Sequence, residues 1–128
     1  MIAVVNYDRG KSIALGNIFK KLGFHYKLTK DEREICRCDK IILPDSTNID
    51  STIKKLQLLN LASVLRVLKK PILGINMGFA VLCKNIIGHN IEGLGLLNID
   101  VHFLTEHENF IKEEHTELVK VYPDRMNA

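Results

Sequence analysis

Hydrophobic and polar residues alternate along the first 75 positions in the way expected of strands joined by helices. Short apolar runs typical of strands lie at 2–5, 24–28, 40–43 and 72–75. Stretches with helical spacing of apolar residues, or with a helix-capping start, lie at 12–22, 29–34 and 51–68. Strands that alternate with helices form parallel sheets. The pattern therefore predicts a three-layer α/β domain with a mainly parallel, flavodoxin-like sheet, and the apolar run at 72–75 predicts a strand covered on both faces.

The second part of the chain is less regular. A helix is predicted from Met77 to Ile86, and two short strands, antiparallel or at an edge, at 94–97 and 100–104. Beyond residue 104 the pattern weakens, although 119–122 could form a last strand. Residues 1–105 hold fifteen basic and nine acidic side chains, whereas 106–128 hold three and six. We therefore expect an α/β domain over 1–104 and a charged tail over 105–128.

The composition of the chain excludes several classes of protein. With 46% hydrophobic and 26% charged residues in 128 positions, the chain can bury a core of its own, which excludes disorder as the main state. No apolar stretch approaches the eighteen or so residues that span a bilayer, and the first residues predict a strand rather than a signal peptide. We expect a cytoplasmic protein without a membrane segment. Aromatic residues make up 6% of the chain and tryptophan is absent, so nucleic-acid binding has no support.

The segment Pro71-Ile-Leu-Gly-Ile-Asn-Met-Gly-Phe79 predicts a sharp turn from a strand into a helix. Gly74 and Gly78 stand two residues before and after Asn76, which is the spacing of a nucleophile elbow. Asparagine tolerates a positive φ angle at the apex better than most residues. Its neutral carboxamide has no usable thiolate or alkoxide, so it cannot act as a nucleophile.

Four segments, which follow one another in the same order as in the family, resemble the class I glutamine amidotransferases. Within that class they are most similar to the glutaminase subunits of imidazole glycerol phosphate synthase. They are Met1-Ile-Ala-Val-Val-Asn-Tyr7 with Gly10, Asp39-Lys-Ile-Ile-Leu-Pro44, Pro71-Ile-Leu-Gly-Ile-Asn-Met-Gly78 and Glu92-Gly-Leu-Gly-Leu-Leu97. The resemblance covers about residues 1 to 104. It implies a class I amidotransferase core, glutamine hydrolysis by a Cys-His-Glu triad, and delivery of ammonia to a cyclase barrel.

The chain departs from that family at the positions that carry the chemistry. The catalytic cysteine is replaced by Asn76. The loop after Pro44, glycine-rich in the family and part of its oxyanion hole, begins with Asp45 and Ser46, and a carboxylate there opposes a developing negative charge. Further departures are Ala80 after the elbow and Asp8, Arg9 and Lys11 in the first loop, which in the family faces the partner.

The family's H-x-E motif comes from a much longer chain, so the sequence is interpreted as truncated. His115-Thr116-Glu117 reproduces that spacing in a polar setting, and is weighed as a relic of the motif against an ordinary surface segment. Cys83 is weighed as a displaced nucleophile against a buried structural thiol, and the second interpretation is favoured.

Other groupings offer weaker chemistry. Cys36 and Cys38 with His25 form one close cysteine pair without a second cluster, which favours a turn over a zinc site. Three histidines and three basic residues are interpreted mainly as solvated surface groups: His102, His107, His115, Arg66, Lys69 and Lys70. No cofactor or metal is expected.

We therefore predict a degenerate glutaminase-like protein without the family's hydrolase activity, which docks on or regulates a synthase-type partner such as a cyclase-like barrel. Three alternatives stay open. The chain could be an active amidotransferase subunit completed by another chain, a small-molecule-binding regulatory module that uses the crevice at the carboxyl ends of the strands, or a decaying gene product.

Overall fold

A four-stranded parallel sheet forms the centre of the fold, in the order β2-β1-β3-β4. A computed structural model describes residues 1–103 and 119–123. The strands are β1 Ile2–Val5, β2 Tyr26–Thr29, β3 Lys40–Leu43 and β4 Ile72–Gly74. The predicted α/β class with a parallel sheet is confirmed. The second strand begins two residues later than predicted, and Phe24 is exposed.

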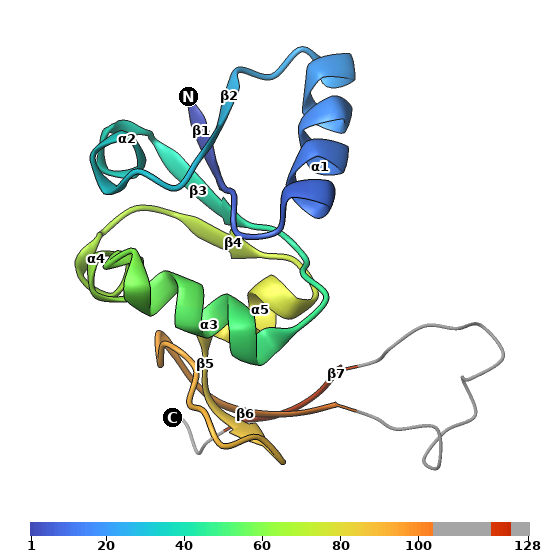
Figure 1. The fold of residues 1–128 in the computed structure, drawn as a ribbon, viewed down its shortest axis with the longest axis vertical. Coiled ribbons are helices and arrows are strands. Elements are labelled where there is room, and N and C mark those ends of the chain that lie inside the picture. Colours follow the sequence, from blue (N-terminus) through green and yellow to red (C-terminus); the bar gives the residue numbers. More distant parts are fainter. Residues whose placement is uncertain (104–118, 124–128) are drawn as a thin grey trace, which may run out of the picture.

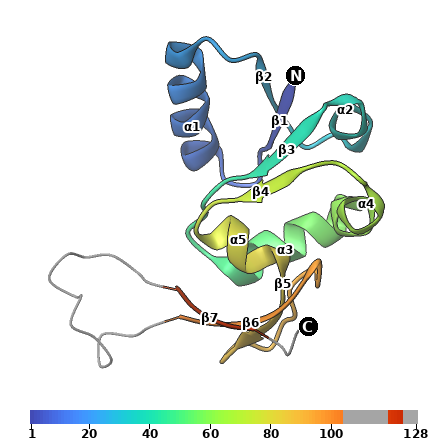
Figure 2. The same ribbon diagram turned by 180° about the vertical axis from the view of Figure 1, so that it is seen from behind.

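Helices lie on both faces of this sheet (Figures 1 and 2). They are α1 Arg9–Leu22, α2 Glu32–Arg37, α3 Ile49–Leu58, α4 Leu61–Val67 and α5 Met77–Leu82. The chain moves from β1 outward to β2 and then back across β1 to β3. Because parallel crossovers are right-handed, this reversal places α1 on one face and α2 on the other. Helices α3 and α5 contact each other on the face that carries α2, and α3 also contacts α4.

The start of α1 differs from the prediction, which placed it at Ser12. Asp8 has extended backbone geometry, and its side chain accepts a hydrogen bond from the Lys11 amide, so the helix begins at Arg9. At the other end Gly23 has a φ of 80°, the left-handed conformation that ends many helices. The end of α1 was predicted correctly.

The single helix predicted over 51–68 is wrong, because the chain breaks between Leu58 and Leu61. Asn60 has a φ of 62° and ends the first helix, as its side chain permits. The break reorients α4 so that Leu61 and Leu65 are fully buried. Helical spacing of leucines did not distinguish one helix from two.

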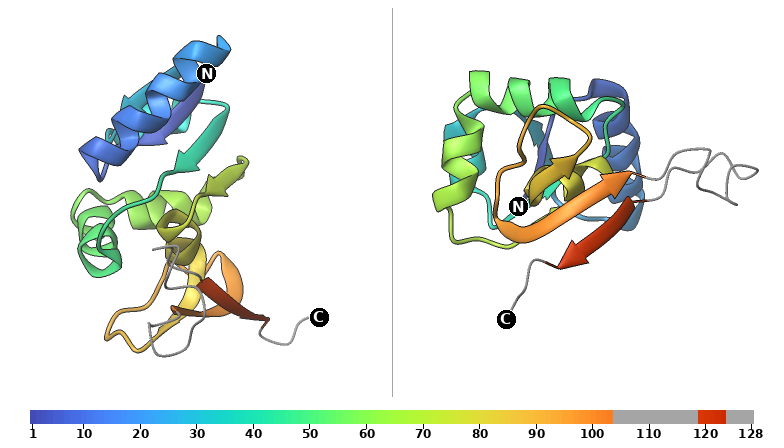
Figure 3. Two further views of the ribbon diagram at one scale, coloured as in Figure 1. Left: turned by 90° about the vertical axis from the view of Figure 1, so that its right-hand side faces the viewer. Right: turned by 90° about the horizontal axis from the view of Figure 1, so that it is seen from below.

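The helix predicted over 77–86 is also wrong in its second half. It ends at Leu82, and Cys83–Ile87 forms β5, whose residues are β-branched at Ile86 and Ile87. The two strands predicted at 94–97 and 100–104 are one strand, β6 Leu97–Phe103, which runs parallel to β5. Val119–Pro123 forms β7 and pairs antiparallel with β6, within the segment expected to be a tail. Figure 3 shows β6 and β7 side by side, away from the four-stranded sheet.

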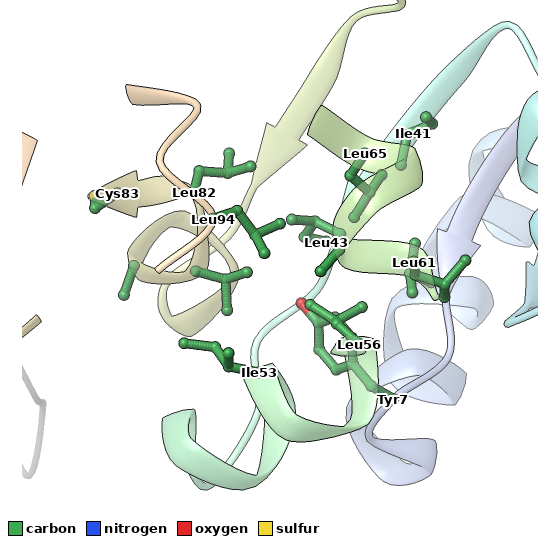
Figure 4. Packing of buried hydrophobic residues seen from close by; sticks show 14 of the residues in the cluster. Tyr7, Ile41, Leu43, Ile53, Leu56, Leu61, Leu65, Leu82, Cys83 and Leu94 are labelled. Carbon is green, nitrogen blue, oxygen red and sulfur yellow. The ribbon is translucent and has the colours of Figure 1, made fainter. Parts of the chain in front are cut away.

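The main core lies between the four-stranded sheet and the helices α2 to α5 (Figure 4). Each fully buried Leu or Ile there stabilises the fold by roughly 1.5–3 kcal/mol. Its largest fully buried side chains are Ile35, Ile41, Leu43, Ile53, Leu56, Leu61 and Leu65. Leu82, Cys83 and Leu94 extend this core toward the second sheet. One continuous apolar cluster therefore holds both sheets together.

Candidate functional site

The turn between β4 and α5 has the backbone of a nucleophile elbow. Asn76 stands at its apex with φ 51° and ψ −110°, outside the regions that most residues adopt. A residue held in such a conformation costs of order 1–3 kcal/mol and persists only where its surroundings impose it. The Asn76 side chain is exposed and makes no capping hydrogen bond.

Two glycines make this turn sterically possible. A Cβ atom on Gly74 would lie 2.6 Å from the backbone of Gly78 and Phe79. A Cβ atom on Gly78 would lie 2.0 Å from the carbonyl oxygen of Leu43. These contacts are with backbone atoms, which cannot move aside as a flexible side chain does. Strand β4, helix α5 and the end of β3 can approach this closely only because both residues are glycine.

The loop after β3 places a carboxylate against the elbow. Asp45 Oδ1 accepts a hydrogen bond from the Met77 amide at 3.2 Å and from the Ser46 amide at 2.9 Å. In a nucleophile elbow, the amide that follows the apex is an oxyanion-hole donor. Here that donor is occupied by the chain's own negative charge. Lys11 Nζ lies 3.5 Å from Asp45 Oδ2 and partly balances this charge.

Internal hydrogen bonds hold the same loop in place. The Tyr7 hydroxyl donates to the Pro44 carbonyl at 2.5 Å, and the Thr52 hydroxyl donates to the buried Ser46 hydroxyl at 2.8 Å. Burial raises the pKa of Tyr7 well above its ordinary value, and the charges of Asp45 and Asp8 raise it further. The hydroxyl therefore stays protonated and remains a donor to the loop.

Cys83 lies at the end of α5 and the start of β5, not inside the helix predicted over 77–86. Its side chain is fully buried, and the thiol lies 3.4 Å from the Phe79 carbonyl as a donor. Burial, with a smaller effect of Asp100, raises the pKa of the Cys83 thiol to about 11. A nucleophilic cysteine needs the opposite shift. This environment suits a structural thiol.

The remaining predicted ligands do not converge. Cys36 is exposed while Cys38 is buried, and His25 is an exposed residue just before β2. In residues 1–103 and 119–123, no group of three or more His, Cys, Asp or Glu side chains is placed to hold a metal. Three predicted candidates lie outside the described residues: His107, His115 and Glu117.

Two of the basic residues predicted as solvated surface groups are exposed (Arg66) or half-buried (Lys70), and both also bind backbone carbonyls. Arg66 Nε donates to the Leu94 carbonyl at 2.9 Å, which joins α4 to the loop before β6. Lys70 Nζ donates to the carbonyls of Cys36 and Cys38, at 2.7 Å for Cys38, and so closes the end of α2. These cations act as structural ties between segments.

The sequence predicted, as one alternative, a ligand crevice at the carboxyl ends of the strands, but not the residues that form it. The structure has a cavity at the carboxyl ends of β1 and β2. It has a volume of about 560 Å³ and is lined in part by Asn6, Arg9, Lys30 and Lys55. Asn6 directly follows β1 and Lys30 directly follows β2. The carboxyl ends of parallel strands meet at one edge of a sheet, so the positions just after the first two strands were the available signal.

The fold is that of a glutamine amidotransferase. A solved structure, described as the crystal structure of glutamine amidotransferase, superposes with a TM-score of 0.70 over 79% of this chain and 55% of that chain, at 19% sequence identity. A likeness at this identity shows the fold alone. The parallel sheet with helices on both faces belongs to this architecture.

The sequence itself defines the family. Residues 9–121 match the SNO glutamine amidotransferase family, to which the chain belongs. It is 35% identical over 99 residues to imidazole glycerol phosphate synthase subunit HisH of Leptospira borgpetersenii, covering 74% of this chain and 48% of that protein. It is 36% identical over 97 residues to subunit HisH 2 of Legionella pneumophila strain Lens, covering 76% and 49%. The chain thus spans about half the length of these relatives. No helix in its described part is long and apolar enough to cross a membrane.

Proposed function

We propose that this chain is a glutaminase-like subunit that does not hydrolyse glutamine by the family mechanism and instead docks on, or regulates, a synthase-type partner. The observation that carries the proposal is the elbow, whose backbone is kept while Asn76 stands at its apex. Amide hydrolysis by this route needs a thiolate at the apex to attack the substrate carbonyl. A carboxamide cannot form that bond.

The Asp45 contact supports the same conclusion independently. A tetrahedral intermediate would place a negative oxygen near the Met77 amide, where Asp45 Oδ1 already accepts a hydrogen bond. The carboxylate would both compete for the donor and repel the developing charge. Removing one oxyanion-hole donor alone slows an enzyme by roughly 100- to 1,000-fold.

Docking is supported by the relatives and by the first loop. Two relatives are named as subunits of imidazole glycerol phosphate synthase, so a protein of this family works as part of an assembly in those cases. Asp8 links the first loop to the elbow loop, because its Oδ2 accepts from the Thr47 amide at 3.2 Å. A partner that contacts this loop would therefore affect the position of the elbow loop. The partner we propose is a cyclase-like barrel that then uses free ammonia.

A direct assay of ammonia release from glutamine tests the inactive elbow. We expect no turnover above background, with the chain alone or with the cyclase subunit of an imidazole glycerol phosphate synthase. Cys83→Ala and, as a matched control on an exposed thiol, Cys36→Ala are assayed in parallel. Turnover that Cys83→Ala abolishes and Cys36→Ala preserves would show that the inactive interpretation is wrong.

Docking is tested separately by titrating the chain into the same cyclase subunit in a calorimeter and by following ammonia-dependent synthesis. We expect a complex, and a synthesis rate that changes when the chain is added. Absence of both binding and any rate effect would contradict the docking role.

A regulatory small-molecule role is the second candidate function. The cavity at the ends of β1 and β2 favours it, because its charged lining is entirely basic.

A further inference from the structure

A cavity of about 560 Å³ lies where β1 and β2 end, between the first turns of α1 and the last turn of α3. Its volume falls within the range of pockets that hold small ligands, roughly 300–1,000 Å³. It is separate from the elbow, since β3 lies between β1 and the elbow strand β4 in the sheet. Glutamine chemistry at the elbow therefore does not account for it.

The charged side chains that line this cavity are all basic. Arg9 and Lys30 make no ion pair with any carboxylate in the described part of the chain. Lys55 Nζ donates to the Tyr7 carbonyl at 3.0 Å, which holds its ammonium group at the cavity. All three side chains are exposed, so water screens their mutual repulsion, and an anion bound among them would be attracted by each.

The acidic residues that adjoin Arg9 and Lys30 in the sequence are already engaged elsewhere. Asp8 accepts hydrogen bonds from the amides of Lys11 and Thr47, on the side of the elbow loop. Asp31 accepts from the Arg33 amide as the cap of α2. Neither carboxylate lines the cavity, so its positive charge has no counter-ion there.

A neutral polar group in the wall also lacks a partner. The Oδ1 atom of Asn6 is buried and makes no hydrogen bond within the described part of the chain. An unsatisfied buried acceptor costs roughly 1–3 kcal/mol. A carboxamide can both accept and donate hydrogen bonds, so a hydroxyl group bound beside Asn6 would be able to satisfy it.

Apart from Tyr7, whose hydroxyl bonds to the Pro44 carbonyl, the rest of the wall is apolar. Ile13, Leu28, Leu58 and Leu59 line it beside the polar groups. We propose that this cavity binds a small organic phosphate that carries hydroxyl groups. The phosphate lies between Arg9 and Lys30, a hydroxyl meets Asn6, and the carbon skeleton packs on Ile13 and Leu28. A dianion matches several cations better than a single carboxylate does, and arginine binds phosphate in a bidentate manner.

Calorimetric titration of the purified chain tests this assignment without any partner or glutaminase activity. The probes are glucose 6-phosphate, inorganic phosphate and glucose, each at low and at high salt. We expect glucose 6-phosphate to bind at least tenfold more tightly than inorganic phosphate, glucose not to bind, and affinity to fall as salt rises.

Two pairs of substitutions locate the site. Arg9→Gln with Lys30→Gln removes both unpaired cations and is expected to weaken glucose 6-phosphate binding by about tenfold or more for each cation. Lys20→Gln with Lys54→Gln removes two exposed cations from the same or a neighbouring helix outside the cavity, and is expected to leave binding within about twofold. Asn6→Ala should weaken glucose 6-phosphate but not inorganic phosphate.

Three results would overturn the assignment. One is no binding of any phosphate. Another is equal affinity for inorganic phosphate and glucose 6-phosphate, which would leave a simple anion site. The third is an equal loss in the two double variants, which would show attraction by net charge alone. A failure here leaves the elbow proposal untouched, because no result depends on glutamine or on a partner.

Discussion

The two faces of the four-stranded sheet have similar apolar residues, but helices bury one face much more completely than the other. On the face packed against α2 to α5, Ala3 and Ile41 are 0% and 1% exposed. On the other face Val4 and Ile42 pair with each other, and Ile42 pairs with Leu73 at the edge. Helix α1 covers the near end of that row, while Leu73 is 58% exposed. Burial decreases along the row with distance from α1.

This difference corrects the expectation that the strand at 72–75 is covered on both faces. An apolar strand can be buried on both faces, but whether it is buried depends on helices formed by other segments of the chain. Helix α1 buries only Ser12 and Gly16 completely, and Ile18 and Leu22 on it are 52% and 63% exposed. The covered face therefore carries most of the stability, and three tests with five variants examine that difference.

The largest effect is expected at Gly78, where α5 crosses the end of β3 on the covered face. Gly78→Ala places a Cβ atom 2.0 Å from the Leu43 carbonyl oxygen, so backbone must move and the elbow must open. We expect a loss above about 4 kcal/mol in the free energy of unfolding, or no stable fold. Urea denaturation followed by circular dichroism measures it.

Gly10→Ala is the matched control on α1. The nearest atom to its Cβ lies 3.9 Å away and it is helical, so we expect a gain of up to about 1 kcal/mol. Equal losses in the two alanine variants would contradict the packing described for the elbow.

A pair of leucines compares the two faces directly. Leu56 in α3 is fully buried, and Leu56→Ala should cost about 2–5 kcal/mol of unfolding free energy. Leu73→Ala on the open face should change it by less than about 0.5 kcal/mol, as an exposed substitution does. Comparable losses at both positions would show that the open face is covered in solution.

The smallest effect on stability is expected from the hydrogen bond between the Tyr7 hydroxyl and the Pro44 carbonyl. Because the pKa of Tyr7 is raised in the folded state, its contribution to stability is complete below the unfolded value of about 10 and is lost as pH rises above it. Tyr7→Phe should cost about 1–3 kcal/mol at neutral pH, since the Pro44 carbonyl loses its donor.

The measurement is the free energy of unfolding from pH 8 to pH 11. The wild-type chain should lose stability more steeply above pH 10 than Tyr7→Phe. Parallel curves would mean that Tyr7 is not the group responsible.

Much of the fold follows from local patterns, and the failures have identifiable causes. Strands β1 and β3 and the end of α1 were predictable because apolar runs, Gly23 and Pro44 mark them. The break at Asn60 was not, because its left-handed conformation depends on how α4 packs. Likewise β5 was predicted as a helix, because its apolar spacing fits either element and its pairing with β6 is a tertiary contact.

The candidate site was also predictable only in part. The spacing of Gly74, Asn76 and Gly78 indicated the elbow from sequence, and Asp45 was expected near the oxyanion position. Its hydrogen bond to Met77 and the assembly of Arg9, Lys30 and Lys55 around one cavity required the tertiary structure. The sequence identifies which residues lie at strand ends. Whether their side chains surround one cavity depends on the twist and order of the strands.

The strand order also sets when this molecule can fold. Ile2 pairs with Tyr26 and also with Lys40, and Ile41 pairs with Ile72, so every ladder of the main sheet joins distant segments. Contacts this far apart in sequence slow folding, because each closes a long loop. During synthesis at roughly 5–20 residues per second, β1 and β3 must wait seconds before β4 leaves the ribosome. Until then the apolar side chains of β1 and β3 lack part of their final packing, a state that favours aggregation.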